Sequence, residues 1–238
     1  MKNAYYIARR ELSAYFVSPI AYVISAIYLA VMGGLFGFIL YYSHEATMRY
    51  VLLHGVSILF LVLVTQVITM RLLADERRLG TLELLLTSPV RDWEVIVGKY
   101  LASLGLFSLM VVLTGYLPLL LIRIGNPDIG VMLSGYLGYL LLGAALLSIG
   151  IFASSLTQSQ IVAAILGIGI TLILWLSGAL GDFVGGSLKG FFGYLPIFDH
   201  YMDFVRGVID TKDIVYYLSV VAVFLFLSTR VVESRRWK

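Results

Sequence analysis

The 238-residue sequence contains no cysteine and only three histidines, and charged residues make up just 13% of it. Without cysteine the chain forms neither disulfides nor thiolate metal sites, and three scattered histidines offer few ligands for zinc. The HExxH, GxSxG and Walker A motifs of metalloproteases, hydrolases and ATPases are also missing from the sequence. These absences argue against a metalloenzyme and show that this chain carries no ATPase motif of its own.

Apolar residues are abundant: they make up 60% of the sequence, and the mean hydropathy is +0.95. The net charge is +3, but the basic residues sit beside long apolar runs, where they set membrane topology rather than bind nucleic acid. We therefore predict an all-α polytopic membrane protein in contact with lipid, with one transmembrane domain over residues 1–238.

Four uncharged runs, 12–43, 50–70, 100–122 and 129–181, are long enough to cross a bilayer, since about 20 helical residues cover a hydrocarbon core of about 30 Å. A fifth run, 214–229, has only 16 uncharged residues, but Arg230 can snorkel and Val231 and Val232 continue the span. The longest uncharged run, 129–181, would be about 80 Å long as one helix, so it must form two spans with a turn at the polar residues 154–160. Pro118 is expected to kink the third span. The predicted spans are 20–42, 50–74, 97–122, 131–153, 160–181 and 213–232, and residues 182–212 form an external segment with short lateral or re-entrant helices.

Residues 4–18 precede the first span and place most of their apolar side chains on one helical face, with Arg9 and Arg10 largely opposite. This pattern predicts an amphipathic helix that lies in the headgroup layer. Pro19 favours a break before the first span, because the residue before a proline avoids the α conformation. The alternative is a helix that extends the first span into the cytoplasm.

The basic residues are distributed unequally between the two sides of this six-span plan. The N-terminal tail, the 71–99 stretch and the C-terminal end carry twelve Lys or Arg, whereas the links 43–50, 123–130 and 182–213 carry five. The positive-inside rule therefore places both termini and the 71–99 stretch in the cytoplasm.

The 71–99 stretch holds ten of the 31 formal charges and surrounds a short apolar sequence, LELLL. Thr81 is a candidate N-cap for a short helix over 78–88, which must end near Ser88 because Pro89 follows. An exposed apolar turn flanked by arginines favours a protein partner. Packing against the chain's own helices or the headgroups is the alternative.

Few other polar groups stand out. Gln66 in the second span is expected to bond a neighbouring helix, with a contact to a transported substrate as the alternative. Asp199, His200 and Asp203 in the external segment are expected to form the solvated face of a lateral helix. Their alternative role is in a membrane-integral, lipid-modifying enzyme.

The sequence DERRLGTLELLLTSPVRDWEVIVGKYLA resembles the signature of type-2 (ABC-2) ABC transporter permeases. The C-terminal sequence HYMDFVRGVIDTKDIVYYLSVVAVFLFLSTRVVESRRW is similar to the gliding-motility-associated and nitrous-oxide-reductase-accessory permeases. The resemblance implies an exporter subunit in a prokaryotic inner (plasma) membrane, without chemistry or bound cofactors of its own. Its implied partners are a second identical or homologous permease chain and two separate ATPase subunits, which would hold ATP and Mg.

By the same resemblance, residues 4–18 are a connecting helix that carries Arg9, Arg10 and Glu11, and residues 78–88 are the coupling helix on which the ATPases dock. Gly98 and Lys99 match the start of the third span. Gln66 is a possible polar group of the transport path. The chain has no large external domain, which puts a substrate that needs one in doubt. The implied docking residues are Glu76, Arg77, Arg78, Gly80, Thr81, Leu82, Glu83, Leu84, Leu85 and Leu86.

Overall fold

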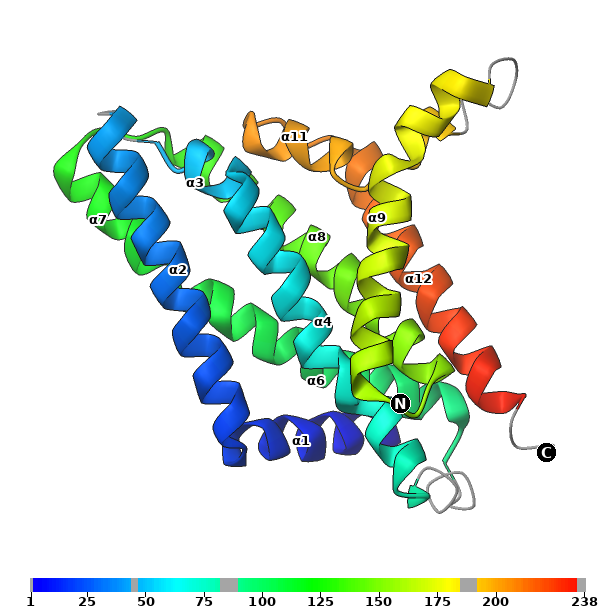
Figure 1. The fold of residues 1–238 in the computed structure, drawn as a ribbon. Helices are drawn as coiled ribbons and strands as arrows, with labels where there is room; N and C mark the ends of the chain where they lie inside the picture. The colour runs from blue at the N-terminus through cyan, green and yellow to red at the C-terminus, as the bar shows by residue number, and fades with distance from the viewer. Residues whose placement is uncertain (1, 44–46, 82–89, 185–191, 235–238) are drawn as a thin grey trace.

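The computed structural model describes residues 2–43, 47–81, 90–184 and 192–234. All the regular secondary structure in these residues is helical, and they contain no strand (Figure 1). Six helices are long and apolar enough to cross a membrane. The prediction of an all-α, six-span membrane protein is thus confirmed. In chain order the helices are α1 (Lys2–Val17), α2 (Pro19–Ser43), α3 (Arg49–Leu53), α4 (Gly55–Arg78), α6 (Asp92–Leu113), α7 (Tyr116–Ile124), α8 (Ile129–Leu156), α9 (Gln160–Val184), α11 (Asp199–Val205) and α12 (Thr211–Glu233).

The central helix of the bundle is α8, which contacts α4, α6, α9, α11 and α12. In α8, 72% of the most apolar stretch is buried. In α2 and α9 only 22% of the equivalent stretch is buried, and in α12 only 17%. Small residues on α8 allow this close packing: a Cβ at Gly143 would lie 2.2 Å from the Phe107 ring, and one at Gly138 would lie 2.5 Å from Phe204. Single glycines thus fix where α6 and α11 pack on the central helix.

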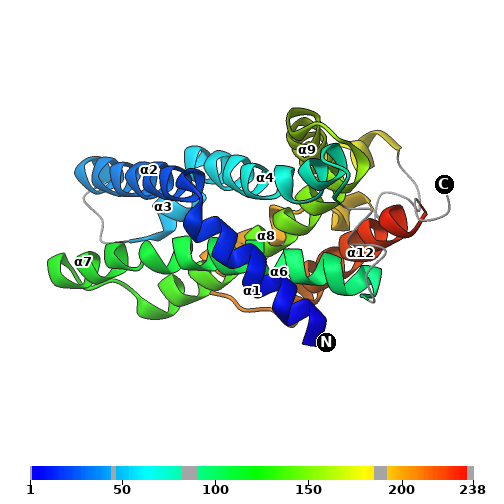
Figure 2. The same ribbon diagram turned by 90° about the horizontal axis from the view of Figure 1, so that it is seen from below.

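The N-terminal helix α1 lies across one end of the bundle, while α2 runs along its length (Figures 1 and 2). The chain turns at Ser18, and Pro19 opens α2, where its missing N–H and fixed φ are compatible with a helix start. This orientation matches an amphipathic helix in the headgroup layer. We call this end of the bundle the α1 end and the opposite one the α11 end.

Gly98 is the point at which α1 crosses α6. A Cβ at this position would lie 2.8 Å from Ile7 Cβ and 2.9 Å from the Ala4 carbonyl oxygen. We expect Gly98→Ala to lower the free energy of unfolding by about 1–3 kcal/mol, because α1 must shift away from α6. Gly105→Ala is the matched control on the same helix, since its Cβ would meet Leu12 Cδ1 at an ordinary 3.5 Å.

Thermal unfolding of the purified protein in detergent measures both variants. The control is expected to be neutral or to gain up to about 1 kcal/mol from the higher helix propensity of alanine. Equal melting temperatures for the two variants would contradict a close helix crossing at Gly98.

The third span breaks at Thr114–Gly115, one helical turn before Pro118, which is where a proline disrupts a helix. The Thr114 hydroxyl donates to the Val111 carbonyl oxygen at 2.6 Å, and a Cβ at Gly115 would lie 2.8 Å from the Val112 carbonyl oxygen. Pro118 lacks the N–H that would bond the Thr114 carbonyl oxygen, which accepts from the Leu117 N–H at 3.0 Å. The expected kink from Pro118 is therefore present, and Thr114 and Gly115 contribute to it.

At the α11 end, α9 continues to Val184 and the short helix α11 lies across the bundle (Figure 1). Gly207 ends α11 with a φ of 89°, a conformation that favours glycine. The Val208 N–H donates to the Asp203 carbonyl oxygen across this turn. A lateral helix thus packs on the bundle within the predicted external segment.

Candidate functional site

Charged side chains from three helices meet at the α1 end. The Lys99 ammonium of α6 lies 2.7 Å from Glu76 Oε1 of α4 and 3.1 Å from Glu11 Oε1 of α1. The Lys99 side chain is only 1% exposed, so its charge is balanced almost entirely by these two carboxylates. We call Lys99, Glu11 and Glu76 the Lys99 junction. It ties the last turns of α4 to α1 and α6.

Arg10 adds a second, exposed cation to this cluster, 2.7 Å from Glu11 and 3.8 Å from Glu76. Burial acts to raise the pKa of Glu11, but the Lys99 charge and the hydrogen bonds from Arg10 and Lys99 outweigh it and lower the pKa below 4.5. Because this pKa is depressed in the folded protein, the contribution of Glu11 to stability is present above pH 4.5. It is lost as the pH falls through the lowered value.

The other side of the α4 end is held by Ser154 of α8. Its hydroxyl oxygen accepts from the backbone N–H groups of Leu73 and Ala74, at 3.1 and 3.0 Å, and donates to the Met70 carbonyl oxygen at 2.9 Å. Ser154, Leu73 and Ala74 are all buried. One small polar side chain thereby fixes the register of α4 against α8.

Two further side chains of the last α4 turns reach α8 and α9. The Arg77 guanidinium donates to the Ser155 carbonyl oxygen at 2.8 Å, and the Gln160 amide donates to the Asp75 carboxylate. The end of α4 is therefore tied to four helices, α1, α6, α8 and α9. A displacement of this end must move at least one of them.

The residues predicted to dock an ATPase divide into three groups. Glu76 and Arg77 make contacts within the chain, whereas Arg78, Gly80 and Thr81 are exposed at the end of α4. The Thr81 hydroxyl donates to the Glu76 carbonyl oxygen at 3.3 Å. Leu82, Glu83, Leu84, Leu85 and Leu86 lie outside the described residues, so most of the coupling helix stays a prediction.

In the predicted connecting helix, Arg9 and Arg10 are exposed and Glu11 enters the Lys99 junction. The partnership of Glu11 with Lys99 was not found from the sequence. A lysine within an apolar run and an acid on the amphipathic helix are its only signals, and nothing in the sequence pairs residues 88 positions apart. The role of Arg9, Arg10 and Glu11 in connection stays a prediction.

Gln66 is buried between α4, α8 and α9, with 1% of its surface exposed. Its amide nitrogen donates to the Leu146 carbonyl oxygen at 3.4 Å. A Cβ at Gly167 would lie 1.8 Å from Gln66 Oε1, and one at Gly150 would lie 2.9 Å away. The side chain therefore fills a slot that two glycines leave open, as expected for a residue that joins helices. Its place in a transport path stays a prediction.

Asp199, His200 and Asp203 do not converge into one site. The His200 Nδ1 lies 2.6 Å from Asp213 Oδ1 of α12, whereas Asp203 lies 3.4 Å from the Lys212 ammonium. The expected solvated face is wrong for His200, which is 8% exposed, because the ring packs on Tyr216 at 3.9 Å. Among the described residues no group of three potential metal ligands is found. The arrangement does not favour the lipid-modifying enzyme.

Comparison with curated proteins gave no match. The model of a protein family described as "ABC-2 family transporter protein" matches residues 7–233, nearly the whole chain and both sides of the Lys99 junction. Such a match supports the ABC-2 class of the sequence resemblance, and the narrower subfamily stays a prediction. With six membrane-spanning helices and a family match along their full length, the chain belongs to the ABC-2 family of transporters, as a multi-pass membrane permease subunit.

Proposed function

We propose that this chain is the membrane-embedded half of an exporter powered by separate ATPase subunits, which dock on residues 78–88. The observation that carries the proposal is the Lys99 junction, which joins the end of α4 directly to α1 and α6. Residues 78–88 follow α4 without another span between them, so a force applied there reaches α4 first.

The ties at the end of α4 give this force a defined route. A movement of α4 would be transmitted to α6 and α1 through the ion pairs of Lys99 and Glu11. It would be transmitted to the central helix α8 through the hydrogen bonds of Ser154. A rigid end shared by several helices allows a small local displacement to select between two arrangements of the bundle. ATP and Mg would act on the partner subunits, since the sequence of this chain has no Walker A motif.

A second permease chain, identical or homologous, completes the proposed transporter. The apolar groove between α2 and α4 supports this part of the proposal, because it is lined by side chains of both helices on the weakly buried side of the bundle. The lining residues of the groove are Ile24, Ile27, Phe60, Leu63, Val64 and Val67.

We further propose a prokaryotic inner membrane, with both termini and residues 78–88 on the side of the ATPases.

The proposal is tested by placing a charge in the predicted docking helix. We expect Leu84→Asp and Leu85→Asp to abolish co-purification of the ATPase from native membranes, because a carboxylate cannot enter an apolar interface without a partner. Ile209→Asp, at an aliphatic residue that is 56% exposed at the α11 end, is the control and should retain the ATPase. Retention of the ATPase by the Leu84 and Leu85 variants would rule out docking at residues 78–88.

A further inference from the structure

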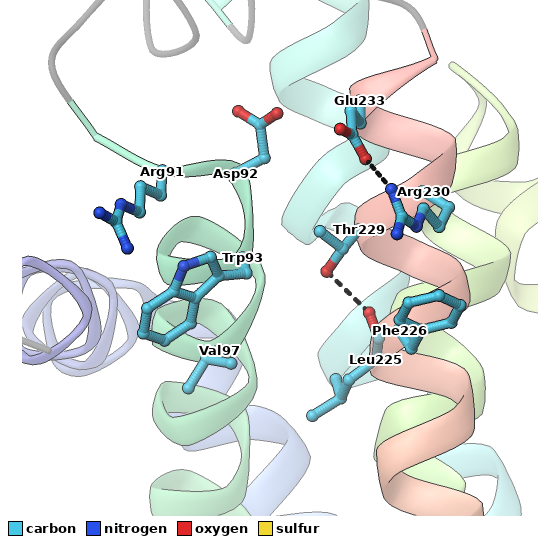
Figure 3. A pocket seen from close by; sticks show the side chains of 9 residues that line it. All are labelled: Arg91, Asp92, Trp93, Val97, Leu225, Phe226, Thr229, Arg230 and Glu233. Atoms are coloured by element: carbon cyan, nitrogen blue, oxygen red, sulfur yellow. Dashed lines mark hydrogen bonds and ion pairs between the residues drawn. The ribbon is translucent and has the colours of Figure 1, made fainter.

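Hydroxyl groups in the spans bond mostly within their own helix, as is usual for serine and threonine in membrane helices. Figure 3 shows one case in the wall of an open groove between α6 and α12: the Thr229 hydroxyl donates to the Leu225 carbonyl oxygen at 2.9 Å. On the central helix α8, Ser148 and Ser155 likewise donate to the carbonyl oxygens three residues before them. Ser154 differs, because the three hydrogen bonds of its hydroxyl all go to the backbone of another helix, α4.

The α4 backbone groups that Ser154 contacts do not need it as a partner. The N–H groups of Leu73 and Ala74 lie inside α4, where the regular acceptor is the carbonyl oxygen four residues earlier. For Ala74 this acceptor is the Met70 oxygen, to which Ser154 also donates. The hydroxyl of Ser154 thus offers a second partner to both ends of one backbone hydrogen bond of α4. Its two lone pairs and its proton are all used in this way.

Residues 70–74, which Ser154 contacts, separate two firmly held parts of α4. Towards the middle of the span, Thr69 packs so closely on α8 that a Cβ at Gly150 would lie 2.0 Å from the Thr69 hydroxyl oxygen. At the α1 end, Glu76 is held in the Lys99 junction, 2.7 Å from the ammonium group. A relative movement of the two parts must therefore be taken up between them.

We propose that residues 70–74 form a hinge of α4 and that Ser154 is the positioning residue that allows it to bend. Insertion of a side chain into the backbone hydrogen bonds is one of the ways in which a helix bends. Ser154 and Ala74 are fully buried, so water does not replace a backbone bond that opens here, and two unpaired groups would be costly. Ser154 removes this cost, because it accepts from the Ala74 N–H at 3.0 Å and donates to the Met70 carbonyl oxygen at 2.9 Å.

The hinge gives the end of α4 a fixed point about which to tilt against the central helix. This role rests on the proposed docking of an ATPase at residues 78–88, where the movement would start. The last turns of α4 would tilt together with the Lys99 junction, while the part before Met70 stays packed on α8. Ser154 holds the two helices in register in both arrangements, which is the property that a two-state coupling element needs.

Spin labels on two introduced cysteines measure the hinge directly in the full chain, since the sequence contains no cysteine of its own. Leu59→Cys and Leu79→Cys place the labels at exposed residues on the two sides of the hinge, about 30 Å apart along a straight helix at 1.5 Å per residue. Pulsed electron paramagnetic resonance in vesicles then gives the distribution of their distances. We expect Ser154→Ala to narrow this distribution towards the single distance of a straight helix, because bending then leaves backbone groups without partners.

Ser155→Ala is the matched control, since Ser155 is the next residue, is 1% exposed and donates to the Phe152 carbonyl oxygen of its own helix. It should keep the distribution of the wild type. A clamp without a hinge predicts the opposite result for Ser154→Ala, a broader distribution, because the loss of three bonds would loosen the end of α4. A distribution in Ser154→Ala as broad as that of the wild type or broader, or equal narrowing in both variants, would overturn the hinge.

ATP hydrolysis by the complex with the ATPase is the second measurement. Ser154→Ala should retain the ATPase in co-purification but lose, several-fold, the effect of the permease on its hydrolysis, whereas Ser155→Ala should keep it. A narrowed distance distribution with unchanged hydrolysis would refute the part of the hinge in coupling. The distance measurement needs no ATPase, so its result holds even where docking at residues 78–88 is refuted.

Discussion

Replacement of Lys99 by methionine is expected to destabilise the α1 end by about 3 kcal/mol and to uncouple α1 from α4. The change removes the cation from two carboxylates that lie 2.7 and 3.1 Å from it and leaves Glu11 and Glu76 to repel each other. Loss of one partner from a buried ion pair costs about 3–5 kcal/mol. The lower end applies here, because the side chains of Glu11 and Glu76 are 16% and 20% exposed. The melting temperature in detergent measures the effect.

The same variant separates docking from coupling. The ATPase should still co-purify, since residues 78–88 are unchanged, but the permease should no longer alter its ATP hydrolysis in reconstituted vesicles. Arg10→Gln is the matched control in this cluster: Arg10 is 58% exposed, and exposed ion pairs contribute about 1 kcal/mol or less.

Neutralisation of all three groups, Lys99→Met with Glu11→Gln and Glu76→Gln, should recover most of the stability, because no buried charge is left unpaired and Arg10, which loses both carboxylates, is 58% exposed. It should not restore coupling, since three ionic contacts between helices are missing. A single Lys99→Met variant as stable as the wild type would show that the junction does not hold α1 in place.

The sequence was sufficient to predict the six spans, because the length of each apolar run is set by the thickness of the bilayer. The break before Pro19 was also predictable, since a proline restricts the residue before it whatever its surroundings. Both features depend on local chemistry. They would be the same whichever helices packed against each other.

Partner choice was not predictable, because in lipid a helix that is apolar all round gives no signal of which face is buried. Lys99 was identified only through the family motif, and its contact with Glu11 depends on how α1 crosses α6 at Gly98. His200 was assigned to a solvated face because its partner, Asp213, lies in the next span.

The pairing of His200 with Asp213 defines the electrostatics of the α11 end. The Nδ1 atom faces Asp213 Oδ1 at 2.6 Å and Nε2 faces the Tyr194 carbonyl oxygen at 3.0 Å, so both ring nitrogens lie beside acceptors. The Asp213 carboxylate is the nearer of the two acceptors and lies in a buried interface, so the His200 ring is its principal partner.

We expect His200→Ala to lower the free energy of unfolding by about 3–5 kcal/mol, the cost of leaving a buried charge without its partner. Asp213 is 0% exposed, and among the described residues its Oδ2 atom has no hydrogen-bond partner, so His200 is its main compensation. The loss also removes the stacking of His200 on Tyr216. Asp203→Ala is the matched control on α11, with a side chain that is 32% exposed and an expected effect below about 1 kcal/mol.

The double variant His200→Ala/Asp213→Ala distinguishes a stranded charge from lost packing. It removes more side-chain volume than His200→Ala alone, so packing predicts a lower melting temperature. Removal of the unpaired carboxylate predicts a higher one, because a buried charge without a partner costs more than a small cavity. We expect the double variant to be the more stable of the two, and accessibility of residues 192–205 to protease should follow the same order. A double variant less stable than the single one would show that the histidine acts through its ring contacts rather than through Asp213.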